Sequence, residues 1–219
     1  MNKVGLLCLN TLLLLNPLQA ATAMDLAAIF RMPVFKIGVV GSAGTVEVSD
    51  NKSFSDVPFK SSGSISPVVT LIQPPVYFGE DTRWGYHTEL NVKYFKLDYD
   101  NDDARYQDGE LKGYTADITP VLFYQWGHKE LCAKCRSWRV EAGVGMNYLN
   151  SDGELKQPDG KDIEFSSVGF GFNSHIGAVV NYRQWELGLR LVVPTQINDD
   201  DDDADARHAL SSVSLAYRF

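Results

Sequence analysis

Charged residues recur at alternate positions within apolar segments of this chain, and they are the first candidates for chemistry. Glu186 and Arg190, for example, alternate with Trp185, Leu187 and Leu189. Successive side chains of an extended strand point to opposite sides, so one side of such a segment is charged and the other is apolar. The charges that this pattern assigns to one interior are Glu89, Lys93, Asp117, Arg139, Glu141, Glu186, Arg190 and Arg218.

This interior set contains as many acidic as basic side chains and is formally neutral. Buried charges persist only when they are paired and hydrogen-bonded, so the simplest interpretation is a closed ion-pair network, with His87 and His175 as further members. Removing Arg190 is then expected to strand its partners and let ions leak through the interior. The alternative is a narrow gated pore that the same charges line. No ligand spacing supports a metal site here.

Two acidic runs are the second candidate. One crowds aspartates into residues 98–103, and the other consists of residues 199–203 followed by Asp205. Hard divalent cations prefer carboxylate oxygens, which makes the second run a weak candidate for cation binding. Its members are Asp199, Asp200, Asp201, Asp202 and Asp203. A run of adjacent aspartates lacks the glycine-turn spacing of a calcium loop, and the alternative for these residues is a solvated loop of mutually repelling charges.

Cys132 and Cys135 lie three residues apart and form a possible disulfide. A thioredoxin-type redox site would place such a pair at the start of a helix in a βαβ unit. Here the pair lies between two predicted strands, which favours a local structural disulfide. The neighbouring Lys129, Lys134 and Arg136 make this turn basic, so a contact with peptidoglycan or a periplasmic protein is an open alternative.

The segments that position these side chains alternate with a period of two, as half-buried strands do. In the last one, Val213, Leu215, Tyr217 and Phe219 share the apolar face. Eight strands are predicted, at residues 35–46, 65–78, 84–94, 114–126, 138–148, 166–182, 184–194 and 211–219. Long polar connections are predicted at 45–64, 97–113, 150–165 and 195–208, and short ones at 79–83, 127–136 and 181–184.

The N-terminus has the three parts of an export signal. Lys3 is basic, residues 4–15 are almost wholly apolar, and Ala21 and Ala23 are the small residues that signal peptidase requires. Cleavage is predicted after Ala23, which makes residues 1–23 a signal peptide. A membrane-spanning helix needs about 20 apolar residues, and the apolar run is too short for a retained anchor. Residues 24–34 are a predicted periplasmic leader, and 35–219 form the barrel domain.

Apolar outer faces and a charged inner face predict an all-β fold, an eight-stranded antiparallel up-and-down transmembrane β-barrel. The sheet must close because lipid leaves an open strand edge without hydrogen-bond partners. Long connections are expected outside the cell and short turns in the periplasm. Trp84, Trp126, Trp138 and Trp185 all lie beside short turns, as in the aromatic girdle of such barrels. The formal net charge of −8 argues against nucleic acid as a partner.

The alternating segments and the C-terminal Leu215, Tyr217 and Phe219 resemble the small outer-membrane barrels, such as the transmembrane domain of OmpA and the OmpX protein. The resemblance covers residues 34–219 and implies a bacterial outer-membrane location, an assembly signal in those three residues, and contact with the barrel-assembly machinery. It also implies outer-membrane lipids and lipopolysaccharide as partners. A monomer without cofactor is expected, and the family implies an activity only weakly.

The expected function is non-enzymatic: a barrel with a polar lumen plugged by side chains, and acidic extracellular loops that contact ligands or surfaces. One alternative is a narrow channel for small or apolar solutes, as in the OmpW group. A less favoured one is a lipid A-modifying enzyme, for which His208, with Asp205, Ser211 and Ser212 nearby, would be the candidate histidine. A palmitoyltransferase needs an apolar lumen, whereas the predicted one is charged.

Overall fold

The computed structural model describes residues 33–50, 54–61, 65–100, 106–129, 135–193, 195–197 and 205–219. All of them belong to the unit Met32–Phe219. The predicted signal peptide and nearly all of the predicted leader lie outside these residues. The described residues contain no helix that is long and apolar enough to cross a membrane.

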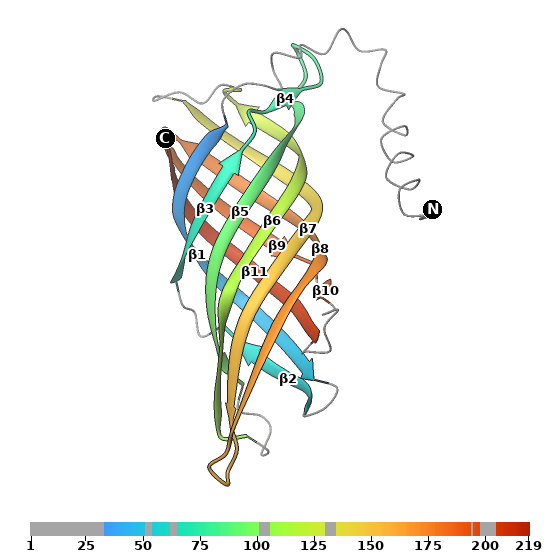
Figure 1. The fold of residues 1–219 in the computed structure, drawn as a ribbon. Coiled ribbons are helices and arrows are strands. Elements are labelled where there is room, and N and C mark those ends of the chain that lie inside the picture. The colour runs from blue at the N-terminus through green and yellow to red at the C-terminus, as the bar shows by residue number, and fades with distance from the viewer. Residues whose placement is uncertain are drawn as a thin grey trace, which may run out of the picture. The chain divides into compact units, whose positions relative to one another are not determined.

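Eight antiparallel strands form a closed ring (Figure 1). They are β1 (Val34–Asp50), β3 (Ile65–Ile72), β5 (Trp84–Tyr99), β6 (Asp108–Gly127), β7 (Arg136–Lys156), β8 (Asp162–Tyr182), β9 (Trp185–Val192) and β11 (Asp205–Arg218). Each pairs with the next in this order, and β11 pairs with β1 to close the ring, from Lys36 opposite Arg218 to Ser49 opposite Asp205. Three short strands, β2 (Phe54–Lys60), β4 (Val76–Tyr77) and β10 (Thr195–Ile197), pair with members of the ring. The predicted fold class is confirmed.

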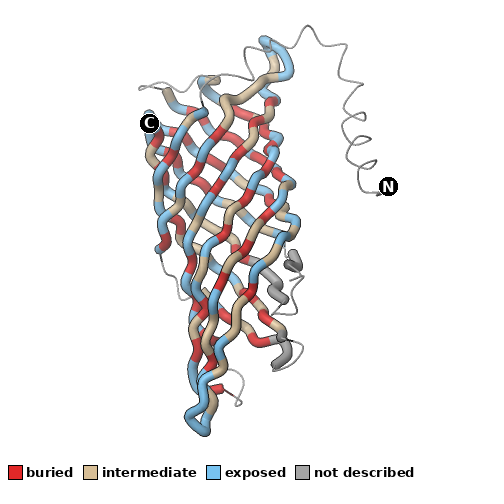
Figure 2. Tube along the Cα trace, in the orientation of Figure 1, coloured by how far each residue is buried: buried red, intermediate tan, exposed pale blue. Residues whose placement is uncertain are grey.

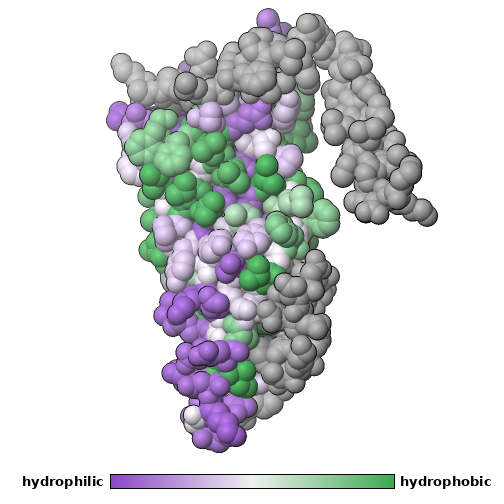
Figure 3. Space-filling view, viewed as in Figure 1, coloured by the Kyte–Doolittle hydropathy of each residue, from purple (hydrophilic) through white to green (hydrophobic). Residues whose placement is uncertain are grey.

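Burial alternates along the strands of the ring wherever their burial is described, as Figure 2 shows. In β9, for instance, Leu187 and Leu189 are exposed while Glu186 between its apolar neighbours is buried. Exposed apolar side chains lie on all strands of the ring and are here called the apolar belt; those on one face of the barrel are green in Figure 3. Its members include Ile37, Val39, Leu90, Val92, Ile118, Leu122, Val140, Val144, Ile176, Val180, Leu187, Leu189, Val213 and Leu215. The predicted assignment of faces agrees with this pattern.

The strands β5 to β8 continue past the apolar belt with their polarity reversed. In β5 the outward side chains from Leu90 to Tyr94 are apolar or aromatic, after which Lys96 and Asp98 point outward while Phe95 and Leu97 are buried inside. β7 and β8 are each 21 residues long, although about 9 to 11 tilted residues cross a membrane. The extensions, residues 95–99, 108–113, 149–156 and 162–167, form one protruding sheet at the lower end of Figure 1.

The protruding sheet corrects the prediction of long polar loops. Most of residues 97–113 and 150–165 are strand, and 45–64 contains the end of β1 and the whole of β2. The inward apolar side chains of these segments and of the adjoining strand residues pack together in a cluster, here called the apolar core. Its burial supplies stabilisation that free loops would lack. Its members are Val46, Val48, Val57, Phe59, Phe95, Leu97, Tyr99, Tyr106, Leu111, Leu149, Leu155 and Leu210, with Ile163 and Phe165 packed against it.

The predicted strand 65–78 is interrupted. β3 ends at Ile72, residues 73–75 are not strand, and β4 follows at Val76. Pro74 and Pro75 are two successive residues without a backbone N–H to give to a neighbouring strand, and the strand is interrupted at them. β4 then pairs with the start of β5, with Val76 opposite Tyr86.

Aromatic rings gather at the end of the barrel where β1 begins and β11 ends. Trp126 and Trp138 stack with ring centroids 3.9 Å apart, Trp84 packs on Tyr124, and Trp185 packs on Tyr217. A second group at the opposite border of the apolar belt joins Tyr114, Tyr148 and Phe170. Two aromatic girdles flanking an apolar band are typical of barrels that cross a membrane.

Candidate functional site

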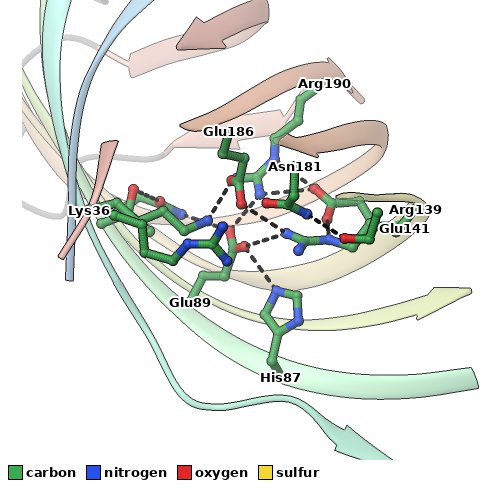
Figure 4. Close-up of polar contacts among 12 residues, drawn as sticks. Lys36, His87, Glu89, Arg139, Glu141, Asn181, Glu186 and Arg190 are labelled. Carbon is green, nitrogen blue, oxygen red and sulfur yellow. Dashed lines mark hydrogen bonds and ion pairs between the residues drawn. The ribbon is translucent and has the colours of Figure 1, made fainter. Parts of the chain in front are cut away.

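The candidate site is a group of charged side chains inside the barrel, here called the ionic cluster and drawn in Figure 4. Its members are Lys36 of β1, Glu89 of β5, Arg139 and Glu141 of β7, and Glu186 and Arg190 of β9. Three cations face three carboxylates. All lie on inward positions of their strands, and the residues on either side of each point outward.

Arg190 is the centre of the ionic cluster. Its Nη2 atom lies 2.6 Å from Oε2 of Glu89 and 2.9 Å from Oε1 of Glu141, and its Nε donates to the same Glu141 oxygen at 3.0 Å. One guanidinium therefore joins β5, β7 and β9 across the lumen. Charge-assisted hydrogen bonds of this length are among the stronger ones in proteins.

Arg139 and Lys36 complete the ionic cluster on its other side. Nε of Arg139 donates to Oε2 of Glu141 at 2.8 Å, and Nζ of Lys36 donates to Oε1 of Glu186 at 2.5 Å. Nη2 of Arg139 lies 3.8 Å from Glu89 and 3.9 Å from Glu186, close enough for attraction but too far for a hydrogen bond. Nearly all of these side chains are buried, so their mutual pairing replaces the hydration they have lost.

Two histidines touch the ionic cluster. Nε2 of His87 lies 2.9 Å from Oε1 of Glu89, whereas Nε2 of His175 is 3.9 Å from Oε1 of Glu141 and has no hydrogen-bond partner among the described residues. The ring of His87 also packs against Phe123, with centroids 5.3 Å apart. Both histidines are buried, so their protonation would add charge to a cluster that is already balanced.

Three residues of the predicted network form no ion pair with the ionic cluster within the described part of the chain. Asp117 accepts hydrogen bonds from Asn91 at 2.9 Å and from Thr119 at 3.2 Å. Lys93 forms no ion pair within 4.0 Å among the described residues, and Arg218 donates to the backbone oxygen of Arg183 at 2.9 Å. The structure thus brings together Glu89, Arg139, Glu141, Glu186 and Arg190 from the predicted set.

Lys36 belongs to the ionic cluster although the predicted set omits it. Its position was visible in the sequence, since it alternates with Phe35 and Ile37 in the first predicted strand. That strand closes the barrel, so Lys36 reaches Glu186 only because β1 and β9 both flank β11. The pairing depends on closure, which no local pattern encodes.

The atoms of His87, Glu89 and Glu141 could meet one metal ion, because one ligand atom from each lies within 4.8 Å of the others. Arg190, however, contacts both carboxylates at hydrogen-bond distance. A divalent cation there would have to displace a guanidinium and would face Arg139 as well. We therefore interpret the three residues as part of the ionic cluster.

The remaining sequence candidates lie largely outside the described residues. This holds for Asp199 to Asp203 and for Cys132, and the side chains of Asp205 and His208 are not described. Cys135 is disulfide-bonded. Leu215, Tyr217 and Phe219 occupy the outward face at the end of the barrel, where the backbone N–H of Phe219 donates to Phe35. Their role in assembly remains a prediction.

A groove of about 850 Å³ lies on the protruding sheet. Carboxylates outnumber lysines along it, with Asp98, Asp108, Glu110, Asp152, Glu154, Glu164, Lys112 and Lys156 in its lining. Lys96 donates to Glu110 at 2.5 Å, and this hydrogen bond raises the pKa of Lys96 above its usual value. At the tip of the sheet, a hydrogen bond from the Lys161 side chain lowers the pKa of Asp159. Sequence reasoning missed the groove because it treated these residues as loops.

A closed ring of eight strands, an apolar belt and two aromatic girdles together define a transmembrane β-barrel of the outer-membrane type, as predicted. No family model and no curated protein sequence matches the chain. It is similar in fold to Ail, the attachment invasion locus protein of Yersinia pestis, at 12% identity and a TM-score of 0.40 over 85% of this chain and 97% of that one.

Two further solved structures are similar in the same way. Neisserial surface protein A matches at 11% identity and a TM-score of 0.42, over 84% of this chain and 97% of its own. The N-terminal β-barrel domain of Pseudomonas aeruginosa OprF matches at 10% identity and a TM-score of 0.38, over 86% of this chain and 98% of its own. At such identities the likeness concerns the fold alone.

Proposed function

We propose that this protein is a non-conducting barrel of the bacterial outer membrane that acts at the cell surface by presenting its protruding sheet to a positively charged partner. The observation that carries the proposal is the reversal of polarity in β5 to β8 beyond the apolar belt. Crossing the membrane does not require four strands of this length, nor a buried core outside the membrane.

The apolar core makes the protruding sheet rigid. Phe59, Leu97, Leu111 and Leu155 are almost inaccessible to solvent, and full burial of such a side chain contributes about 1.5 to 3 kcal/mol. β2 covers part of the core and pairs with β5 at Phe59 and Lys60, and Lys60 forms an ion pair with Asp100. A preformed surface binds without the entropy loss of ordering a loop.

The charge of the sheet selects the class of partner. Its outward positions carry Asp98, Asp108, Glu110, Asp152, Glu154, Asp162 and Glu164 against Lys96, Lys112 and Lys156. The groove therefore attracts cationic groups, and a ligand rich in lysine or arginine fits this chemistry better than an anionic one. Exposed charges are screened within about 8 Å at physiological salt, so the binding should weaken as salt rises.

The lumen supports a barrel that does not conduct. An eight-stranded barrel is just wide enough for side chains to fill its interior, and here the ionic cluster crosses it. The polar lumen would then be plugged by side chains, as the sequence suggested. The narrow-channel alternative requires the native protein to pass ions or solutes, and the lipid A-modifying alternative requires a reactive group at His208.

The location and biogenesis of the protein complete the proposal. Residues 1–23 direct export and are removed, and the barrel-assembly machinery recognises the C-terminal strand through Leu215, Tyr217 and Phe219. The protruding sheet then faces the exterior and the girdle around Trp126 and Trp138 faces the periplasm. Lipids and lipopolysaccharide surround a monomeric barrel.

Binding of a fluorescent octalysine peptide to the purified barrel in detergent tests the proposal. The native protein should bind it, and the affinity should fall with added salt. Glu110→Lys/Glu154→Lys should abolish binding, whereas Glu47→Lys on β1, an acidic residue outside the groove, should leave it nearly unchanged. Absence of octalysine binding by the native protein, or stable single-channel currents from it, would contradict the proposal.

A further inference from the structure

The inward residues between the ionic cluster and the apolar core are polar or small. On β5, Lys93 is followed by Phe95 as the next inward residue, on β7 Asn147 is followed by Leu149, and on β11 Ser212 is preceded by Leu210. Phe95, Leu149 and Leu210 belong to the apolar core. The lumen thus contains a polar level directly beneath an apolar one.

Residues at and beside this polar level point into the closed ring and yet are only partly buried. The side chain of Arg190, at the edge of the ionic cluster, is 21% exposed although it lies inside the barrel. Taken as whole residues, Ser42, Lys93, Asn173 and Ser212 are likewise neither buried nor fully exposed. Inward side chains of a closed barrel can be accessible only to space within it. Serine and asparagine are too small to fill a lumen that longer side chains fill elsewhere.

Polar atoms that border this level lack protein partners. Oγ1 of Thr115, Oδ1 of Asn147, Oδ1 of Asn173 and Nε2 of His175 form no hydrogen bond with the described residues. The pairing of β6, β7 and β8 places these residues on one part of the barrel wall. Thr115 of β6 is opposite Leu149, and along β7 the pairs with β8 are Asn147 with Gly171, Gly145 with Asn173, and Gly143 with His175. Unpaired buried polar atoms are costly and are most often satisfied by internal water.

We propose that the lumen contains a compartment that binds water, separated from the two ends of the barrel by two different barriers. The ionic cluster closes it on the side where β1 begins and β11 ends, and the apolar core closes it on the side of the protruding sheet. The inference rests on the proposed non-conducting barrel and adds that either barrier alone is sufficient to block ions.

With two barriers, a substitution in only one of them is not expected to let ions cross the barrel. If the ionic cluster were the only seal, Arg190→Ala would let ions through, as the sequence alone suggested. With the apolar core intact above the compartment, ions that pass the damaged cluster reach a closed end. Conductance should then require a second change in the apolar core, such as Phe95→Ala/Leu149→Ala.

Cysteine labelling tests the compartment. Ser212→Cys places a thiol in it, and the folded protein in detergent is treated with a small cationic methanethiosulfonate, with the unsubstituted chain as the blank. The thiol should be protected in the Ser212→Cys variant. Adding either Arg190→Ala or Phe95→Ala/Leu149→Ala should accelerate labelling about tenfold or more, the factor given by opening that is 1.4 kcal/mol easier. Asp152→Cys, on the outward face of β7, should react rapidly in every background.

Planar-bilayer recordings on the same variants complete the test, with migration on unboiled gels to show that each barrel is folded. The native protein, Arg190→Ala and Phe95→Ala/Leu149→Ala should all be silent, and the combined variant should conduct. Currents from Arg190→Ala alone, or silence of a folded combined variant, would overturn the two-barrier inference while leaving the proposed function intact. Currents from the native protein would instead overturn the proposed function.

Discussion

Lys36 and Glu186 form an ion pair across the strand that closes the barrel, with Nζ and Oε1 separated by 2.5 Å. Lys36 lies on β1 and Glu186 on β9, and β11 runs between them. The pair therefore joins β1 to β9, which are far apart in the sequence, and it can form only after the ring has closed. Both side chains are less than a tenth exposed.

Removing one partner of this ion pair should destabilise the barrel more than removing both partners. Lys36→Met leaves Glu186 buried with only the more distant Arg139, and removal of one partner of a buried pair costs about 3 to 5 kcal/mol. Lys36→Met/Glu186→Met removes both charges and should cost clearly less. Urea unfolding in detergent measures the three free energies of unfolding. Equal losses for the single and double variants would contradict the prediction, because they would show that an unpaired Glu186 carries no extra cost.

Gly38 is expected to allow the close approach of β1 to β11. A Cβ atom at Gly38 would lie 2.4 Å from the backbone oxygen of Leu215, and overpacking of this kind costs about 1 to 3 kcal/mol. Gly38→Ala should therefore lower the unfolding midpoint and slow barrel closure.

Gly41 on the same strand supplies a matched control. A Cβ there would meet only the backbone oxygen of Val213, at 4.0 Å, so Gly41→Ala should fold like the native protein. The measurement is the fraction of protein with the faster migration of a folded barrel on unboiled gels after a fixed refolding time. Similar defects in both variants would contradict the steric explanation.

The apolar core should stabilise the protruding sheet independently of the part in the membrane. Leu155 is fully buried near the end of β7, and truncation of a buried leucine costs about 2 to 5 kcal/mol. Leu155→Ala should increase hydrogen exchange in residues 108–113 and 149–156 while the exchange in residues 116–124 stays slow. Uniformly faster exchange along β6 would show that the sheet and the barrel unfold as one unit.

The apolar belt predicts that the protein is embedded in a membrane. The protein should fractionate with the outer membrane, remain there after a high-salt wash, and migrate faster on gels before boiling than after. Substituting Arg for Leu122, which faces outward within the apolar belt, should destabilise the folded form by about 2 to 4 kcal/mol, measured by urea unfolding in lipid. A protein recovered in the soluble periplasmic fraction would contradict the membrane assignment.

The sequence by itself determined the faces of the strands. The period of two in a strand is a local property, so Leu187 and Glu186 could be assigned to opposite sides of the wall without knowledge of their neighbours. A continuous apolar outer face also requires closure, because lipid cannot satisfy a free strand edge. These two constraints were enough to predict the fold class and most of the inward charges.

Only the tertiary structure decided where the strands end and which charges meet. Polar residues such as Asp98 and Glu110 look like loop residues until Leu97 and Leu111 are seen to pair across β5 and β6 and pack into the apolar core. The contact of Arg190 with Glu89 joins residues 101 positions apart. Such partners depend on the register of several strands around the ring, and register is a property of the whole barrel that no single segment contains.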